Sequence, residues 1–278
     1  MTQRSALPSA RAVALAALVE PDPTRKVALA LGLRAEAVAG QVAIDPAADL
    51  QPAAGIALPG RPPRPVLVPA QQMPRRNPRD PKGHAALLHA IAHIEFNAIN
   101  LALDAVWRFS GLPERFYRDW IQVAAEEAEH FSLLRAHLQH IGADYGDYPA
   151  HNGLWEMAEK TRCDLLARMA LVPRTLEARG LDVNPAIRAK LAAAGDLRGA
   201  QILDRILADE IGHVAIGNRW YLWACIRQGR DPLCAHEQLA VQFGAPRSKP
   251  PFNRDARMQA GFTAEELDHM ERAQANPG

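Results

Sequence analysis

Two short stretches of the sequence combine carboxylates with an imidazole at a spacing that can bind metal. Glu127 and His130 are three positions apart, and Glu210 and His213 repeat that spacing later in the chain. Residues three apart share one face of a helix, and here that face is otherwise apolar. Charged side chains are unfavourable in apolar surroundings unless something compensates for the lost water. Imidazole and carboxylate together suit iron or manganese, so both stretches predict metal ligation.

Single carboxylates on two further helical runs would extend these pairs to a complete site. The candidates are Glu95, which has apolar helical neighbours, and Glu177, which lies near the end of the third helical run. Glu95 lies 16 residues before Gly111, and Glu127 lies 14 residues after Pro113. If two antiparallel helices are joined by that short turn, both carboxylates come to nearly the same height, at roughly 1.5 Å per residue. The same test is weaker for Glu177, because its helix has a longer connection to the next one.

The full pattern is one Glu from each of two helices and a Glu-x-x-His from each of two others, which is the ligand set of ferritin-like di-metal carboxylate proteins. Without metal, four buried carboxylates would need large pKa shifts, whereas two divalent ions neutralise them. Zinc would favour fewer ligands and often thiolate, so we expect two ions, with iron favoured over manganese. A chance match of surface pairs is the alternative. The predicted metal ligands are Glu95, Glu127, His130, Glu177, Glu210 and His213.

Further acidic residues accompany these pairs. Glu126 and Asp209 each directly precede the glutamate of a pair. In this architecture such an acid can hold the second nitrogen of a metal-bound histidine, and an ordinary surface acid is the alternative. A third Glu-x-x-His pair, Glu266 and His269, follows a Pro-rich segment and belongs to no long helix. We assign this third pair to the surface.

The apolar periodicity is helical from about residue 84 onward, and no period-2 strand pattern is present. We therefore expect an all-α protein whose centre is a ferritin-like four-helix bundle. Pro173 should bend the third helix, and Asn184-Pro185 should start a short helix of its own. The expected long helices are 84–110, 114–141, 154–179 and 197–228. The expected organisation is two short helices within 1–45, a Pro-rich wrapping arm or linker over 46–82, the bundle over 83–229 and a C-terminal extension over 230–278.

The net charge, the cysteines and the apolar runs of the chain limit its binding partners and its location in the cell. The formal net charge of +1 argues against a general electrostatic grip on nucleic acid or on an acidic membrane. The three cysteines are widely spaced and form no CxxC, which favours reduced thiols and a cytoplasmic location. No apolar run approaches the roughly 20 residues of a membrane span. We expect no membrane association, and a homodimer remains open.

The order of the six predicted ligands resembles that of the ferritin-like superfamily. The wider sequence resembles one bacterial ferritin-like family of unknown function, over nearly the whole chain. That resemblance implies the bundle and the metal ligands but no particular reaction. The nearest functional relatives it suggests are bacterial tRNA-modifying hydroxylases, which use a di-iron centre on a similar bundle. The matching stretches are HAIAHIEFNAINLALDAVWRF, FYRDWIQVAAEEAEHFSLL, YGDYPAHNGLWEMA, RMALVPRTLEARGLDVNP and ILADEIGHVAIGNRWY.

Four functions are compatible with such a site. The favoured one is a di-iron oxidoreductase that uses O₂ to hydroxylate or desaturate a small molecule or a tRNA, with a separate electron donor. The others are an iron-handling ferroxidase or storage protein, a manganese enzyme that dismutates peroxide, and a non-enzymatic bundle held together by its metal. A ferritin shell needs compact subunits, which the Pro-rich arm and the C-terminal extension would obstruct. In the oxidoreductase, Glu127 and Glu210 would bridge the ions.

Overall fold

The structure, a computed structural model, describes residues 7–47, 49–73 and 77–275. Within these ranges the chain is helical and contains no strand, only two isolated bridges, Ser9 to Ala43 and Leu67 to Ala150. The prediction of an all-α protein is therefore confirmed. The chain divides into a first unit, Met1–Asn152, and a second unit, Gly153–Gly278.

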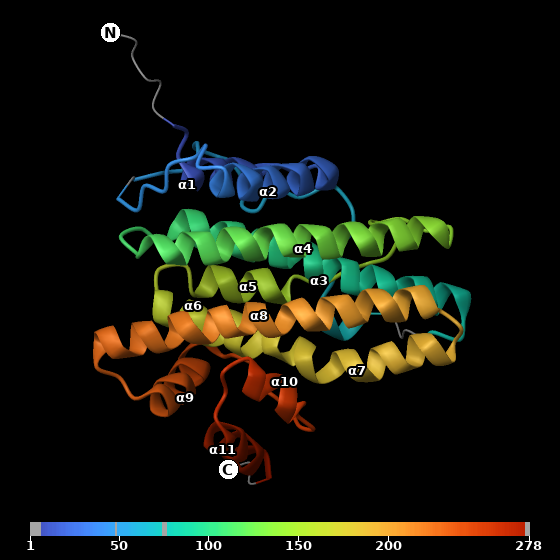
Figure 1. The fold of residues 1–278 in the computed structure, drawn as a ribbon. Helices are drawn as coiled ribbons and strands as arrows, with labels where there is room; N and C mark the ends of the chain where they lie inside the picture. Colours follow the sequence, from blue (N-terminus) through green and yellow to red (C-terminus); the bar gives the residue numbers. More distant parts are fainter. Residues whose placement is uncertain (1–6, 48, 74–76, 276–278) are drawn as a thin grey trace. The chain divides into compact units, whose positions relative to one another are not determined.

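The first unit is built on one long helical hairpin. Asp80 caps the first long helix by accepting a hydrogen bond from the amide of Gly83 at 2.8 Å. The hairpin turns at Gly111, whose φ of 71° suits glycine. In Figure 1 the two N-terminal helices, drawn in blue, lie along this hairpin and contact both of its helices. The helices are α1 (Ala10–Val19), α2 (Pro23–Val38), the short 3-10 helix η1 (Ala70–Gln72), α3 (Pro81–Arg108) and α4 (Glu114–His140).

Helix α3 is the core helix of the first unit. By length and composition alone it could cross a membrane, and no other helix in the described part of the chain could. However, 94% of its apolar window is buried inside the protein, which is the packing of a core helix in a soluble protein. The hydropathy of α3 thus reflects its central position.

The Pro-rich segment that follows α2 is docked on the first unit. Arg11 of α1 donates to the carbonyl of Trp107 at 2.7 Å and to that of Pro46 at 3.1 Å, so it ties the start of the arm to the end of α3. Farther along, the amide of Ala150 donates to the carbonyl of Val66 at 3.0 Å, and the amide of Val68 donates to the carbonyl of Ala150 at 2.8 Å, which forms the bridge at Leu67. The side chains of Val66 and Leu67 are exposed, so backbone pairing anchors this part of the arm.

A buried lysine joins three segments of the first unit. Lys26 of α2 is fully buried. Its ammonium donates to the carbonyls of Leu18 and Gly60 at 2.9 and 3.0 Å and to Oδ1 of Asn100 on α3. These three oxygens suit the charged form, but burial, assisted by the charge of Arg61, lowers the pKa of Lys26 to about 7. The side chain therefore links α1, the arm and α3 at the cost of burying a charge.

The second unit is arranged around one helix of 32 residues, α8 (Leu197–Gln228), whose bounds agree with the expected 197–228. Gly229 ends it in the left-handed conformation, with a φ of 61°. Figure 1 shows α8 in orange running beside α7. The other elements are α5 (Gly153–Lys160), α6 (Leu165–Leu171), the π-helical segment η2 (Val172–Glu177), α7 (Ala178–Ala193), α9 (Pro232–Phe243), α10 (Arg254–Gln259) and α11 (Ala264–Ala275).

The prediction of one continuous helix over 154–179 was wrong. The chain leaves the helix after Lys160 and starts again at Leu165, where Asp164 caps the new helix by accepting from the amide of Ala167. Farther on, the helix does not end near residue 180 but continues to Ala193. The predicted start of a separate helix at Asn184 was also wrong, because its side chain donates instead to a carbonyl of α8.

Pro173 produces the expected irregularity as a π-helical segment. A proline inside a helix cannot donate its backbone hydrogen bond, and the turn widens around it. The wide turn brings Pro173 against α8 at Gly217. A Cβ added to Gly217 would lie 2.4 Å from Cβ of Pro173 and 2.7 Å from its Cγ. The close approach of η2 and α8 therefore requires glycine at this position.

Lys26 predicts a specific pH dependence of stability. Between pH 7 and 10.5 the unfolded chain holds the Lys26 proton while the folded chain releases it. The free energy of unfolding should therefore rise with pH in this window, by at most about 1.4 kcal/mol per pH unit from this group. Urea unfolding of the wild type and Lys26→Met across this range should show that slope only in the wild type. Equal slopes would mean that Lys26 titrates normally.

Gly217→Ala should lower the free energy of unfolding by about 1–3 kcal/mol, because the rigid ring of Pro173 cannot move aside. Gly212→Ala on the same helix is the matched control, since its Cβ would meet nothing within 4 Å. Its better helix propensity should stabilise the protein by up to about 1 kcal/mol. Urea unfolding measures both variants. If both change stability equally, the contact with Pro173 does not constrain α8.

Candidate metal centre

The helical hairpin of the first unit brings three of the predicted ligands together. Nδ1 of His130 lies 3.1 Å from Oε2 of Glu95 and 3.5 Å from Oε2 of Glu127. All three side chains are buried, and each offers a ligand atom within 4.8 Å of the others. The antiparallel register of α3 and α4 sets this meeting, as the spacing from the turn predicts. The first unit thus contains a buried Glu/His cluster that could hold a metal ion.

The electrostatics of this cluster show how strongly it needs a cation. Burial, and then the charge of Glu127, raises the pKa of Glu95 to about 7. Burial alone would lower the pKa of His130, but hydrogen bonds to Glu127 and Glu95 outweigh it and raise the pKa to about 11. An imidazolium proton therefore supplies positive charge between the two carboxylates. A divalent ion would supply more, and it would release the imidazole nitrogen as a ligand.

The second unit carries the other predicted ligands. Nδ1 of His213 lies 3.5 Å from Oε1 of Glu210 on α8, and the histidine is buried. Glu177 is the last residue of the π-helical segment η2, and it is only partly buried. The second unit thus repeats the composition of the first: one single glutamate and one Glu-x-x-His pair on a helix.

The two acids expected beside the metal-bound histidines have other partners. Glu126 accepts a hydrogen bond from Gln122 at 3.0 Å and lies 3.7 Å from Arg34. Asp209 accepts from Nε of Arg205, one helical turn earlier, at 2.5 Å. Both acids thus have polar neighbours in their own unit, and their role beside a metal-bound histidine stays a prediction.

The third Glu-x-x-His pair differs from the expected surface pair. Glu266 is buried and forms an ion pair with Arg174. It also completes a capping box at the start of α11, accepting from the amide of Thr263 at 2.8 Å. His269 pairs with Glu237 of α9 rather than with Glu266. Assigning Glu266 to the surface was therefore wrong, because its carboxylate neutralises a buried guanidinium.

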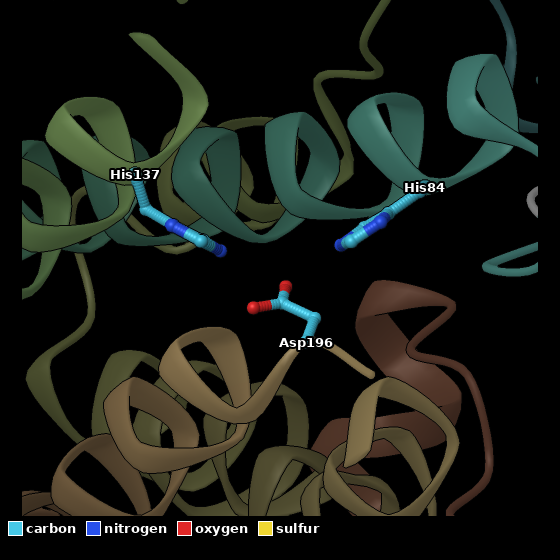
Figure 2. A group of neighbouring side chains, drawn as sticks. All are labelled: His84, His137 and Asp196. Carbon is cyan, nitrogen blue, oxygen red and sulfur yellow. The ribbon is translucent and has the colours of Figure 1, made fainter. Parts of the chain in front are cut away.

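The sequence analysis missed one pair of histidines. Figure 2 shows His84 on α3 and His137 on α4, and each offers a ring nitrogen within 4.8 Å of the other. The comparison of distances from the turn, which was applied to Glu95 and Glu127, could have found them. His84 lies 27 residues before Gly111, and His137 lies 24 residues after Pro113. Asp196, also labelled in Figure 2, caps the first turn of α8. Two imidazoles alone are an incomplete ligand set for the metals considered above.

Comparison with known proteins places the chain in a family. Residues 19–268 match the model of the family described as "Protein of unknown function (DUF455)". The chain belongs to this family. An uncharacterized protein of Haemophilus influenzae is 50% identical over 214 residues, which cover 74% of this chain and 74% of that protein. No solved structure gave a significant match. Because the DUF455 description names no activity, a function for this chain has to come from its own residues.

The donor set fits a hard or borderline divalent ion. The first-unit cluster offers two carboxylates and one imidazole, all removed from water. Oxygen and imidazole ligands without thiolate suit iron and manganese. The cysteines are no part of the cluster: Cys163 and Cys234 are exposed free thiols, and Cys225 is a buried free thiol.

Two buried acids should respond in opposite ways when they are neutralised in metal-free protein. Glu95→Gln removes a carboxylate that burial and a like charge disfavour, so the melting temperature after dialysis against chelator should stay equal or rise. Glu266→Gln leaves the buried guanidinium of Arg174 without its counter-ion and should cost about 3 kcal/mol. Calorimetry of both variants is the measurement. A large loss of stability in Glu95→Gln would show that this carboxylate is stabilising without metal.

Proposed function

We propose that this protein is a di-iron carboxylate oxidoreductase on a ferritin-like four-helix bundle. The observation that carries the proposal is the buried cluster of Glu95, Glu127 and His130. Such a cluster is unfavourable as a structural element alone, because burial and the charge of Glu127 disfavour the ionised form of Glu95 and raise its pKa to about 7. Its persistence at the centre of a helical hairpin is explained if a metal ion binds there.

The second unit supports a centre of two ions. Each unit contributes one single glutamate and one Glu-x-x-His pair, which together make the full ferritin-like ligand set. The carboxylates of Glu127 and Glu210 would be the ligands common to both ions. Glu95 and His130 would hold one ion, and Glu177 and His213 would hold the other. When bound, ferrous iron would supply electrons for O₂ reduction.

The protein's own residues would give the centre its oxidising character by excluding water. On α3, Ala92 and Ile99 flank Glu95 along the helix, and both are fully buried. On α4, Leu134 follows His130 by one turn and is also fully buried. An apolar surrounding of this kind directs an oxidant toward a bound substrate and away from solvent. We therefore favour hydroxylation or desaturation of an organic molecule.

The proposal also specifies a substrate class, an electron donor and a location in the cell. The substrate is a small molecule or a tRNA, and a separate electron donor returns the iron to the ferrous state. The three free thiols favour the reducing cytoplasm. Iron storage is the less favoured function, because a segment of Pro-rich chain and α1–α2 already cover the hairpin of the first unit. Ferritin-like shells need such helices free to pack against other subunits.

Metal analysis tests the centre directly. We expect chelator-treated protein, reconstituted anaerobically with ferrous iron, to bind about two ions per chain. Glu127→Gln and Glu210→Gln should each reduce this to about one ion or fewer, since each removes a shared ligand. Glu129→Gln is the matched control on α4, because its side chain is 43% exposed. If either Glu127→Gln or Glu210→Gln keeps the full iron content, the shared centre is excluded.

Oxygen uptake then separates the oxidoreductase from iron storage. After the first two ferrous ions per chain have been loaded, further ferrous iron should not drive O₂ uptake by the proposed enzyme, which would consume O₂ only when a reductant and an organic substrate are present. A storage protein would oxidise and retain each new addition. Continued iron oxidation that remains with the protein would therefore replace the proposed function by iron handling.

A further inference from the structure

A cavity in the second unit has the size of a small-molecule site. Its volume is about 590 Å³, and it lies between η2, α9, α11 and the segment that follows α9. Pockets of roughly 300–1,000 Å³ are typical of ligand sites. None of the described residues that line it is one of the six candidate metal ligands. The cavity therefore offers a site that the proposed metal centre does not use.

The walls of this cavity are largely apolar. Leu233 and Val241 of α9 line one side, and Phe262 and Met270 line another. Val241 is 79% exposed, so apolar surface faces solvent at the mouth of the cavity. Contact between such an apolar surface and water is unfavourable, and a ligand with a hydrocarbon body would cover the surface. The walls thus favour a ligand with a hydrocarbon body.

The polar floor of the cavity offers one hydrogen-bond acceptor. The hydroxyl of Thr175 on η2 donates its single proton to the carbonyl of Ala170 at 2.8 Å. Thr175 Oγ1 also lies 2.9 Å from Nε2 of His236, so the histidine must be the donor in that contact. Burial lowers the pKa of His236 to about 4, which leaves the ring neutral with its proton on Nε2. Nδ1 is then an acceptor without a partner among the described residues.

The charged side chains that line the cavity differ in their partners. Arg174 is neutralised by its ion pair with Glu266, and Glu237 contacts Nε2 of His269. Arg247 is different, because it is exposed and has no ion-pair or hydrogen-bond partner in the part of the chain that the structure describes. Its guanidinium can receive a carboxylate in a bidentate arrangement at the rim.

We propose that this cavity binds a hydroxylated organic acid. Its hydrocarbon body lies against the apolar walls, its hydroxyl donates to Nδ1 of His236, and its carboxylate pairs with Arg247. Nδ1 of His236 and the guanidinium of Arg247 select for the two polar ends of the molecule. The apolar walls select only for its hydrocarbon middle. This binding does not depend on the proposed metal centre, so either proposal can fail without the other.

Calorimetric titration with three ten-carbon probes tests the selection, at concentrations where none forms micelles. The probes are 10-hydroxydecanoate, decanoate, which lacks the hydroxyl, and 1,10-decanediol, which lacks the carboxylate. We expect 10-hydroxydecanoate to bind saturably and about tenfold more tightly than either of the others, since each lacks one polar contact. Equal binding of all three, or no saturable binding of 10-hydroxydecanoate, would overturn the proposal.

Two variants locate the contacts. Arg247→Gln should weaken 10-hydroxydecanoate about tenfold and leave the diol unchanged, because only the acid uses the guanidinium. Lys249→Gln is the matched control, since this neighbouring cation is exposed and does not line the cavity. His236→Phe should abolish the preference for 10-hydroxydecanoate over decanoate. If Lys249→Gln weakens binding as much as Arg247→Gln, the attraction is a general surface effect and the proposed contact is excluded.

Discussion

The imidazole of His130 lies between the carboxylates of Glu95 and Glu127, and all three side chains are removed from water. This contact constrains the helices that carry it. A shift of α3 against α4 by one residue would rotate one partner away by about 100° and leave a buried carboxylate without its hydrogen bond. The register of the hairpin is therefore set by polar chemistry as well as by packing.

Side chains from α1 and α2 contact the outside of that hairpin and hold it in place. Arg11 binds the carbonyl of Trp107 at the end of α3, where the helix has no internal donor left for it. Lys26 reaches Asn100 in the middle of the same helix while also holding the end of α1 and the arm. The buried side chains of Arg11 and Lys26 thus hold α3 at two separate heights. A helix held in this way moves little when a ligand binds between it and α4, which favours a preorganised site.

The sequence predicted the long helices where local signals agreed with tertiary packing, and it erred where they did not. The bounds of α8 agree with expectation because Asp196 caps one end and Gly229 the other. Gly180 looked like a helix stop, but the helix runs through it, since packing along α8 outweighs the roughly 1 kcal/mol that glycine costs. The role of Glu266 could not be predicted, because its partner Arg174 lies 92 positions away. Register from a short turn predicted the Glu95–Glu127 contact, because few residues separate the two helices.

The docked arm has a consequence for the order in which the protein can be assembled during synthesis. Val66 bonds to Ala150, so the arm has no partner for this bridge until 84 further residues have left the ribosome. At roughly 5–20 residues per second, the wait lasts on the order of 4–17 seconds. The many prolines of the arm keep it extended and unable to form helix in that interval. The newly synthesised arm can therefore remain unpaired at this bridge until α3 and α4 have folded, and it docks on them last.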